Sequence, residues 1–222
     1  MSLLPCIEKE TAADPRYSIL WLHGLGADGN DFAPIVPELV AADWPALRFV
    51  FPHAPVRPVT VNGGMAMRAW YDIAGIDIAS KQDEAGVRAS IGAVEALIAR
   101  EVERGVPCER IFLAGFSQGG AIALAAGLRH AVKLAGIVAL STYLPLHEKT
   151  VDELADGNRD TAIFQAHGTA DPVVAPTLGT MTRDWLREAG YHVDWHDYPM
   201  GHQVCAEEIV DLRVWLSPRL KA

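Results

Sequence analysis

Cysteine is scarce in this chain of 222 residues, in which only Cys6, Cys108 and Cys205 carry a thiol. Three thiols spread over the whole length are too few and too far apart in sequence for a disulfide framework or a thiolate metal site. Such a use of cysteine suits a reducing compartment. We therefore expect a cytoplasmic location.

Basic residues are also in deficit, because 19 Lys and Arg face 28 Asp and Glu and leave a net charge of −9. Phosphates of DNA or RNA would repel a chain this acidic, so no nucleic-acid partner is expected. The sequence also lacks H-E-x-x-H, and the pair His192 and His196 falls in a run expected to be a strand rather than a helix. We expect neither a metal nor a cofactor.

Long hydrophobic runs are missing as well. The uncharged stretch 111–128 approaches the length of a membrane span, but glycine, serine and glutamine in its middle favour a strand, a turn and a helix. The N-terminus shows no basic segment and no apolar run of signal-peptide length, so no secretion signal is expected. No low-complexity tract or repeat divides the chain. We expect one domain, residues 1–222, without stable membrane insertion.

What the sequence does contain is an alternation of strand and helix signals. Buried strands are expected at 17–22, 47–51, 111–114, 134–140, 161–167 and 193–198, with a short edge strand at 3–7. Helical patterns separate most of these runs. This alternation predicts an α/β fold, with a mostly parallel, twisted sheet, helices on both faces, and functional sites at the carboxyl ends of the strands.

Three further expectations concern the segments between the strands. A helix is expected to start at Asn30 or Asp31, either of which is a suitable cap. The connection 52–80 is expected to be irregular, and the polar segment 147–160 is expected to form exposed surface. The long helix after the connection is expected to start at a capping box made by Ser80 and Asp83.

One corner between a strand and a helix carries a catalytic pattern. Gly115, Ser117 and Gly119 spell G-x-S-x-G between the strand 111–114 and the helical run 121–129. At so tight a bend a Cβ beside the serine would strike the following helix or the neighbouring strand, which explains the glycines. The hydroxyl of Ser117 is expected to project above the sheet edge. The alternative is a glycine-rich turn in some other α/β protein.

Two more residues of the matching types follow strands. Asp171 comes after the strand 161–167 and His202 after 193–198, so the chain order is Ser, Asp, His, as in the α/β-hydrolase fold. Each has an ordinary alternative: Asp171 as a helix cap, and His202 as an exposed loop histidine. The three together, in this order and in the expected loops, favour a catalytic site.

The chemistry of ester cleavage needs these residue types. A serine hydroxyl is a weak nucleophile until a base takes its proton. An imidazole can accept that proton and return it to the leaving group, and His202 would provide it. Asp171 would fix the tautomer of the imidazole, and the backbone N–H groups of Leu25 and Gln118 would form an oxyanion hole.

The loop that holds Leu25 has a competing interpretation. Gly24, Gly26 and Gly29 also match the G-x-G-x-x-G pattern of dinucleotide-binding folds. That fold places an acidic residue at the end of its second strand, whereas the strand 47–51 ends in Pro-His-Ala-Pro. A nicotinamide-dependent oxidoreductase remains an alternative, and so does a non-catalytic binding protein with the same fold.

Contacts to the acyl group are expected from Met65 and Trp70 in the long connection and from Leu144 in the loop 141–146. Long ordered loops are usually functional, and these side chains suit an apolar pocket. For the methionines and aromatic residues of the connection, the alternative is that they only cover the core.

Several stretches resemble the phospholipase/carboxylesterase family, which includes acyl-protein thioesterases and small bacterial carboxylesterases. They are LHGLGADGNDF, NGGMAMRAWYDI, QDEAGV, RIFLAGFSQGGAIAL, LAGIVALSTYLP, HGTADPVV and the final Gly201-His202. The resemblance covers almost the whole chain from Tyr17 onward. It implies a single-domain α/β-hydrolase fold with no separate lid domain, hydrolysis of carboxylic esters or thioesters, and a triad at Ser117, Asp171 and His202.

Two details of the resemblance bear on the substrate. The segment NGGMAMRAWYDI is most similar to the bacterial carboxylesterases, and Gly201 stands where eukaryotic thioesterases usually carry methionine. The sequence therefore predicts a carboxylesterase for short- to medium-chain acyl esters, with thioesters and lysophospholipids as further candidate substrates. Acyl-protein thioesterase activity is the alternative. A weak homodimer is also expected, because related hydrolases pair through exposed apolar surface.

Overall fold

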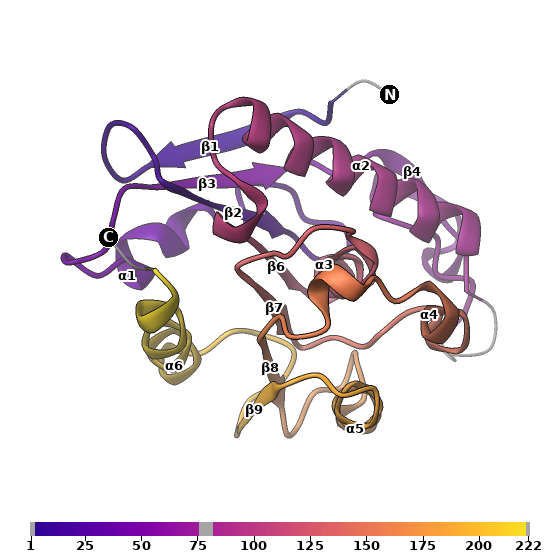
Figure 1. Ribbon diagram of the computed structural model, residues 1–222. Coiled ribbons are helices and arrows are strands. Elements are labelled where there is room, and N and C mark those ends of the chain that lie inside the picture. Colours follow the sequence, from indigo (N-terminus) through magenta and orange to yellow (C-terminus); the bar gives the residue numbers. More distant parts are fainter. Residues whose placement is uncertain (1–2, 76–81, 221–222) are drawn as a thin grey trace.

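Seven strands form one sheet in the order β1-β3-β2-β6-β7-β8-β9 (Figure 1). The computed structural model describes residues 3–75 and 82–220. Within the sheet β1 runs antiparallel to β3, and every other neighbouring pair is parallel. The strands are β1 (Cys6–Glu10), β2 (Tyr17–Leu22), β3 (Leu47–Pro52), β6 (Ile111–Phe116), β7 (Gly136–Leu140), β8 (Ile163–Gly168) and β9 (Val193–Tyr198).

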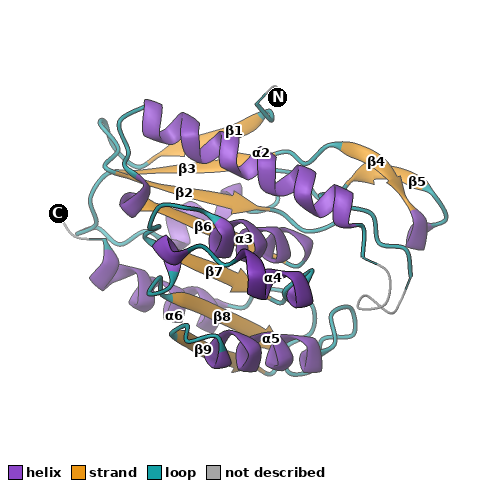
Figure 2. Cartoon of the chain, turned by 45° about the vertical axis from the view of Figure 1, so that its right-hand side comes forward, coloured by secondary structure: helices purple, strands orange, loops and turns teal. Residues whose placement is uncertain are grey.

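Helices cover both faces of this sheet (Figures 1 and 2). On one face α2 packs against α3, and α4 and α5 extend the same layer; on the other face α1 packs against α6. The helices are α1 (Val36–Leu39), α2 (Glu84–Glu103), α3 (Gln118–Arg129), α4 (His147–Glu153), α5 (Pro176–Glu188) and α6 (Ala206–Leu216). The α/β fold class expected from the sequence is confirmed.

Strand β2 shows how a buried strand separates the two helical layers. All of its residues are buried. Ile19 and Trp21 belong to the apolar core beneath α1 and α6, whereas Leu20 and Leu22 belong to the core beneath α2 and α3. Side chains alternate between the faces of a strand, so a strand covered on both sides must be apolar throughout. The strand ends are then the places where polar chemistry can be exposed.

A hairpin replaces part of the irregular connection. Strands β4 (Val56–Val59) and β5 (Met65–Arg68) pair antiparallel in a separate small sheet. Gly63 and Gly64 turn the chain with φ of 67° and 77°, which glycine adopts without a steric penalty. The prediction of irregular structure was wrong here, because two strands of four residues, in which only Val59 is buried, leave no hydrophobic pattern.

Two other segments differ from expectation. The region 147–160 contains α4, and Asn158 is fully buried, where its side chain bonds to Leu134 N and to the carbonyls of His130 and Val132. The helix expected near residue 30 is reduced to a 3-10 turn, Ala33–Ile35, followed by the short α1. A proline in the first turn of each piece explains the break, since proline cannot donate to a preceding turn.

Helix α2 begins later than expected. Asp83 is its N-cap and accepts a hydrogen bond from Gly86 N at 2.9 Å, so the cap is Asp83 rather than a box with Ser80. Ser80 lies outside the described residues, and the limits 1–222 of the domain stay a prediction. None of the described helices is long and apolar enough to cross a bilayer. No separate lid domain occurs within residues 3–75 and 82–220.

Candidate active site

Ser117 occupies the corner between β6 and α3. Its backbone has φ 54° and ψ −123°, a conformation that side-chain-bearing residues rarely adopt. Two hydrogen bonds from the neighbouring strand hold it: Ser117 N donates to Leu140 O at 2.9 Å, and Thr142 Oγ1 donates to Ser117 O at 2.7 Å. The surrounding structure therefore enforces a strained turn that points the hydroxyl away from the sheet.

The flanking glycines are sterically required at this corner. A Cβ on Gly115 would lie 2.4 Å from the backbone of Gly119, and one on Gly119 would lie 2.2 Å from Leu22 O. Both contacts are with backbone atoms, which cannot move aside as a flexible side chain can. Helix α3 can therefore begin directly against β2 and β6 only because these positions lack a Cβ.

The structure joins Ser117, His202 and Asp171 in a chain of two hydrogen bonds. His202 Nε2 lies 2.9 Å from Ser117 Oγ, and His202 Nδ1 lies 2.7 Å from Asp171 Oδ2. The Asp171 carboxylate accepts from Nδ1–H, which leaves Nε2 free to accept the serine proton. Ser117 and Asp171 are buried, and the ring of Phe116 packs against that of His202 with centroids 4.7 Å apart. Partial exclusion of water strengthens both hydrogen bonds.

Asp171 combines the two roles considered for it. Its Oδ1 accepts hydrogen bonds from Val173 N at 2.8 Å and Val174 N at 2.9 Å, while Oδ2 faces His202. The first pair of bonds fixes the turn that follows β8. Because one oxygen is held by the backbone, the other is aimed at the imidazole without rotational freedom.

His167 is a neighbour of Asp171 that our sequence analysis did not single out. It is 1% exposed, its Nε2 donates to Val174 O at 2.9 Å, and the same nitrogen lies 3.5 Å from Asp171 Oδ2. Burial lowers the pKa of His167, so the ring is neutral and Nε2 carries its single proton. A histidine ending a buried strand beside the aspartate loop is the signal that could have indicated it.

Hydrogen bonds of His23 and Trp70 hold the glycine-rich loop that follows β2. His23 Nδ1 donates to Gly24 O at 2.7 Å and Nε2 accepts from Ala54 N at 3.0 Å, so both ring nitrogens are used within the structure. Burial lowers the pKa of His23, in keeping with a neutral ring. Trp70 Nε1 donates to His23 O at 2.9 Å. The hydrogen bonds of His23 are thus satisfied within the protein.

The two residues expected to form an oxyanion hole, Leu25 and Gln118, belong to segments that adjoin Ser117. Leu25 follows Gly24, and a Cβ built on Gly24 would lie 3.6 Å from the Cβ of Ser117, so this loop runs directly beside the serine. Gln118 is the first residue of α3, where the backbone N–H has no partner within the helix. The Gln118 side chain is fully used, because it accepts from Trp70 N and donates to Tyr71 O, both at 2.8 Å.

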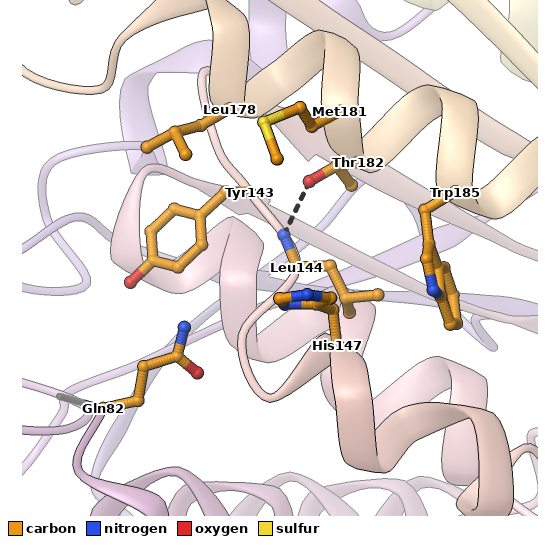
Figure 3. Close-up of a pocket in the computed structure, with 8 residues that line it drawn as sticks. All are labelled: Gln82, Tyr143, Leu144, His147, Leu178, Met181, Thr182 and Trp185. Atoms are coloured by element: carbon orange, nitrogen blue, oxygen red, sulfur yellow. Dashed lines mark hydrogen bonds between the residues drawn. The ribbon is translucent and has the colours of Figure 1, made fainter. Parts of the chain in front are cut away.

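A pocket of about 240 Å³ opens between the loop after β7 and helix α5 (Figure 3). Its wall is mainly apolar, and Leu144 N donates to Thr182 Oγ1 at 2.9 Å across it. The lining residues are Gln82, Tyr143, Leu144, His147, Leu178, Met181, Thr182 and Trp185. Leu144 therefore lies in the pocket wall.

The other two residues expected to contact the acyl group lie elsewhere. Met65 is 65% exposed on the β4–β5 hairpin. Trp70 is fully buried, and its hydrogen bonds to His23 and Gln118 place it behind the loop. The structure thus gives Trp70 a supporting position, for which a sequence pattern contains no indication because both partners are about 47 residues away along the chain.

Comparisons with known proteins agree with this architecture. The profile of the family described as Phospholipase/Carboxylesterase matches residues 6–219. This chain belongs to the phospholipase/carboxylesterase family. As a member of that family it is a serine hydrolase of the carboxylesterase and thioesterase class. The resemblance noted in the sequence is confirmed.

Relatives within the family include both kinds of hydrolase. Acyl-protein thioesterase 1 of Neurospora crassa is 43% identical, over 98% of this chain and 91% of its own. A protein of Oryza sativa subsp. japonica named "Probable carboxylesterase" is 37% identical, over 99% of this chain and 84% of its own. The crystal structure of SOBER1 from Arabidopsis thaliana superposes with a TM-score of 0.88 at 33% identity, covering 93% of this chain and 100% of that one.

Membership of this family decides against the oxidoreductase alternative. The glycines that mimic a dinucleotide fingerprint have another use here, since a Cβ on Gly29 would lie 2.4 Å from Phe51 O. Gly29 thus permits close packing of the loop on β3. Within the described residues, no group of three or more His, Cys, Asp and Glu is arranged to hold a metal ion.

Proposed function

We propose that Ser117, His202 and Asp171 form a catalytic triad that hydrolyses carboxylic esters and thioesters through an acyl-serine intermediate. The observation that carries the proposal is the continuous chain of hydrogen bonds from Asp171 Oδ2 through the imidazole to Ser117 Oγ. Because Asp171 accepts from Nδ1–H of His202, Nε2 can act as a base toward the hydroxyl of Ser117, which the strained corner exposes to the site.

The reaction follows from these positions. Ser117 Oγ attacks the acyl carbonyl carbon as its proton passes to His202 Nε2, and the resulting oxyanion accepts hydrogen bonds from the N–H groups of Leu25 and Gln118. The imidazolium, stabilised by Asp171, then protonates the leaving alcohol or thiol. Water repeats the sequence on the acyl-serine, so the acid is released and Ser117 recovers its proton.

The pocket beside the loop after β7 is the proposed acyl site. Thr142, which contacts Ser117 O, directly precedes the lining residues Tyr143 and Leu144, so the pocket begins close to the nucleophile. Its volume of about 240 Å³ is below the roughly 300–1,000 Å³ usual for drug-sized ligands. We therefore propose short- to medium-chain acyl groups. Contact of the exposed Met65 with substrate stays a prediction.

Esters and thioesters are both retained as substrates. The similarity to acyl-protein thioesterase 1 of Neurospora crassa favours thioesters at least as strongly as the sequence motifs favour oxygen esters. A panel of oxygen esters and thioesters with matched acyl chains of graded length separates the two. Higher kcat/KM for the thioesters at every chain length would make the thioesterase the better description. The cytoplasmic location and the weak homodimer also stay predictions.

Ser117→Ala tests the mechanism. We expect turnover of a p-nitrophenyl acyl ester to fall by at least ~10³-fold, because no other group in the site replaces the nucleophile. Ser217→Ala, the same change at the far end of the chain, should leave turnover intact. Circular dichroism and thermal unfolding verify that both variants are folded. Full activity of folded Ser117→Ala would exclude the proposed mechanism.

A fluorophosphonate probe tests the remaining alternative of a non-catalytic binding protein. An activated serine is labelled by this reagent, and the labelling depends on its base. We expect the wild-type protein to be labelled and His202→Ala to be unlabelled, as read by mass spectrometry of the peptide that contains Ser117. An unlabelled wild-type protein would favour the binding protein.

A further inference from the structure

Two tyrosine hydroxyls meet inside the protein next to the proposed acyl pocket. The oxygens of Tyr71 and Tyr143 are 2.7 Å apart, and the residues are 2% and 6% exposed. Each tyrosine is tied to the nucleophile corner: Gln118 Nε2 donates to Tyr71 O, and Thr142, bonded to Ser117 O, precedes Tyr143. Gln118, which follows Ser117, therefore holds the backbone of Tyr71, and Thr142, which contacts Ser117, holds the chain just before Tyr143.

Within the described residues, one of the two hydroxyl hydrogens of this pair has no acceptor. Two hydroxyls hold two hydrogens, and the bond between them uses one. Across residues 3–75 and 82–220, neither hydroxyl makes a second hydrogen bond. Tyr143 lines the pocket whereas Tyr71 does not. Tyr71 must then donate to Tyr143, because the opposite arrangement would enclose an unpaired hydrogen on Tyr71; the hydrogen of Tyr143 is left to face the pocket.

Both hydroxyls keep their hydrogens under any ordinary assay condition. Burial raises the pKa of Tyr143 to about 12. Burial, reinforced by the neighbouring hydroxyl, raises the pKa of Tyr71 well above its usual range. The donor on Tyr143 is therefore permanent rather than dependent on pH.

Among the described residues that line the pocket, none accepts a hydrogen bond from the Tyr143 hydroxyl. Figure 3 shows the ring of Tyr143 between Leu178 and Gln82, with its hydroxyl on the side of Gln82. The side-chain oxygen of Gln82 accepts from Leu146 N, and Thr182 Oγ1 accepts from Leu144 N. The other lining residues are the largely apolar Leu144, Leu178, Met181 and Trp185, together with His147. A ligand that fills the pocket with hydrocarbon alone would bury the Tyr143 hydrogen unpaired.

We propose that the Tyr143 hydroxyl donates a hydrogen bond to an oxygen on the acyl chain of the substrate. The site then selects acyl groups that carry a carbonyl or hydroxyl oxygen partway along the chain over all-carbon acyl groups of equal length. This inference rests on the proposed function, since it assigns the pocket to the acyl group. Tyr143 is the specificity-determining residue.

A series of p-nitrophenyl esters tests the proposal. One member has an all-carbon medium-length acyl chain, and the others replace a single methylene by a carbonyl at successive positions. For the wild-type enzyme we expect one position to raise kcat/KM about tenfold over the all-carbon ester, the effect of one added hydrogen bond in an enclosed site. In Tyr143→Phe this preference should vanish, so that the ester with the favoured carbonyl and the all-carbon ester are hydrolysed with similar kcat/KM.

Tyr71→Phe is the matched control. It also removes one hydroxyl from the pair, but Tyr143 keeps its donor, so we expect the preference to persist. The proposal is overturned if no carbonyl position is preferred by the wild-type enzyme, or if the preference survives Tyr143→Phe. Failure of the proposed function looks different, because turnover of the all-carbon ester would then be absent or independent of Ser117.

Discussion

At the scale of single residues, Asp171 is held in place by groups other than Ser117 and His202. The carboxylate is held by two backbone N–H groups at one oxygen, and His167 lies 3.5 Å from the other. His167 also donates to Val174 O, whose own N–H binds Asp171. The His167 ring therefore connects the end of β8 to the loop that holds Asp171. We infer that His167 is a positioning residue.

The pair His167→Leu and His167→Gln tests this role. Leucine removes the donor, so the Asp171 loop should loosen and kcat fall about tenfold with little change in KM, since substrate contacts are unaffected. Glutamine can place its amide N–H near the position of Nε2 and should retain most of the activity. Steady-state kinetics on a p-nitrophenyl ester distinguishes them. Equal losses in both variants would show that the ring acts through its packing alone.

At the scale of secondary-structure elements, the strand–turn–helix corner depends on missing side chains. We expect Gly119→Ala to destabilise the protein by about 2–4 kcal/mol and to reduce turnover sharply, because its Cβ would lie 2.2 Å from Leu22 O. Gly75→Ala is the control, since nothing lies within 4 Å of a Cβ there. Urea unfolding measures both. A Gly119→Ala variant as stable as Gly75→Ala would contradict the steric argument.

How far the sequence predicts these elements depends on whether their signal is local. The run 17–22 coincides with β2, and the sharp bend at Ser117 follows from glycines two residues away on either side. Strand order also brings residues 117, 171 and 202 to one sheet edge, where the structure joins them by hydrogen bonds. Hydrophobic periodicity and the order of the strands are therefore enough to predict the buried strand, the bend at Ser117 and the edge of the sheet where the three residues meet.

What the sequence could not predict rests on contacts between distant segments. Trp70 binds His23 and Gln118 across 47 and 48 positions, and the partner of Tyr143 is 72 residues away. No residue pattern in one segment indicates the side chain it will meet in another. The prediction of exposed surface failed at Asn158 for the same reason. A polar segment is expected to be exposed unless the backbone groups that its side chains bond to are known.

Helix α6 carries an ionisable side chain, Glu208, on its buried face. The side chain is fully buried and burial raises its pKa to about 8 from an ordinary 4.5. The folded protein thus holds a proton that the unfolded chain releases between these values. The stability contributed by this group is fully present below about pH 4.5 and is lost as the pH rises through about 8.

Glu208→Gln should remove that pH dependence, because the amide cannot ionise. We expect its Tm to exceed that of the wild-type protein by a few degrees near pH ~9 and to match it near pH ~5. The exposed neighbour gives the control Glu207→Gln, which should change Tm little at either pH. Thermal scans at the two pH values provide the measurement. A constant difference between wild type and Glu208→Gln at both would show that Glu208 does not titrate in this range.

At the scale of the whole molecule, the proposed catalytic site and a buried cluster of ion pairs around Glu101 lie at opposite ends of the sheet. The triad follows the carboxyl ends of β6, β8 and β9, whereas Ser18 and Arg48 lie near the amino ends of β2 and β3. There Glu101, at the end of α2 and fully buried, accepts from Arg48 and Ser18 at 2.8 and 2.7 Å. Arg104 adds a further contact at 3.0 Å.

This separation predicts that stability and activity can be changed independently. Burial alone would raise the pKa of Glu101, but the hydrogen bonds from Arg48 and Ser18 and the charges of Arg104 and Arg48 outweigh it and lower that pKa. Stability from the cluster is therefore present above the ordinary glutamate pKa and lost as the pH falls.

We expect Glu101→Gln to cost about 3 kcal/mol, because the buried Arg48 loses its enclosed counter-charge, and to lower Tm by about 10 °C. Glu103→Gln, at an exposed position on the same helix, should change Tm by less than ~2 °C. Below the unfolding range, kcat/KM of Glu101→Gln should stay within about twofold of wild type, since no hydrogen bond of the cluster reaches the triad. A large loss of kcat/KM in the folded variant would instead show that the two ends of the sheet are coupled.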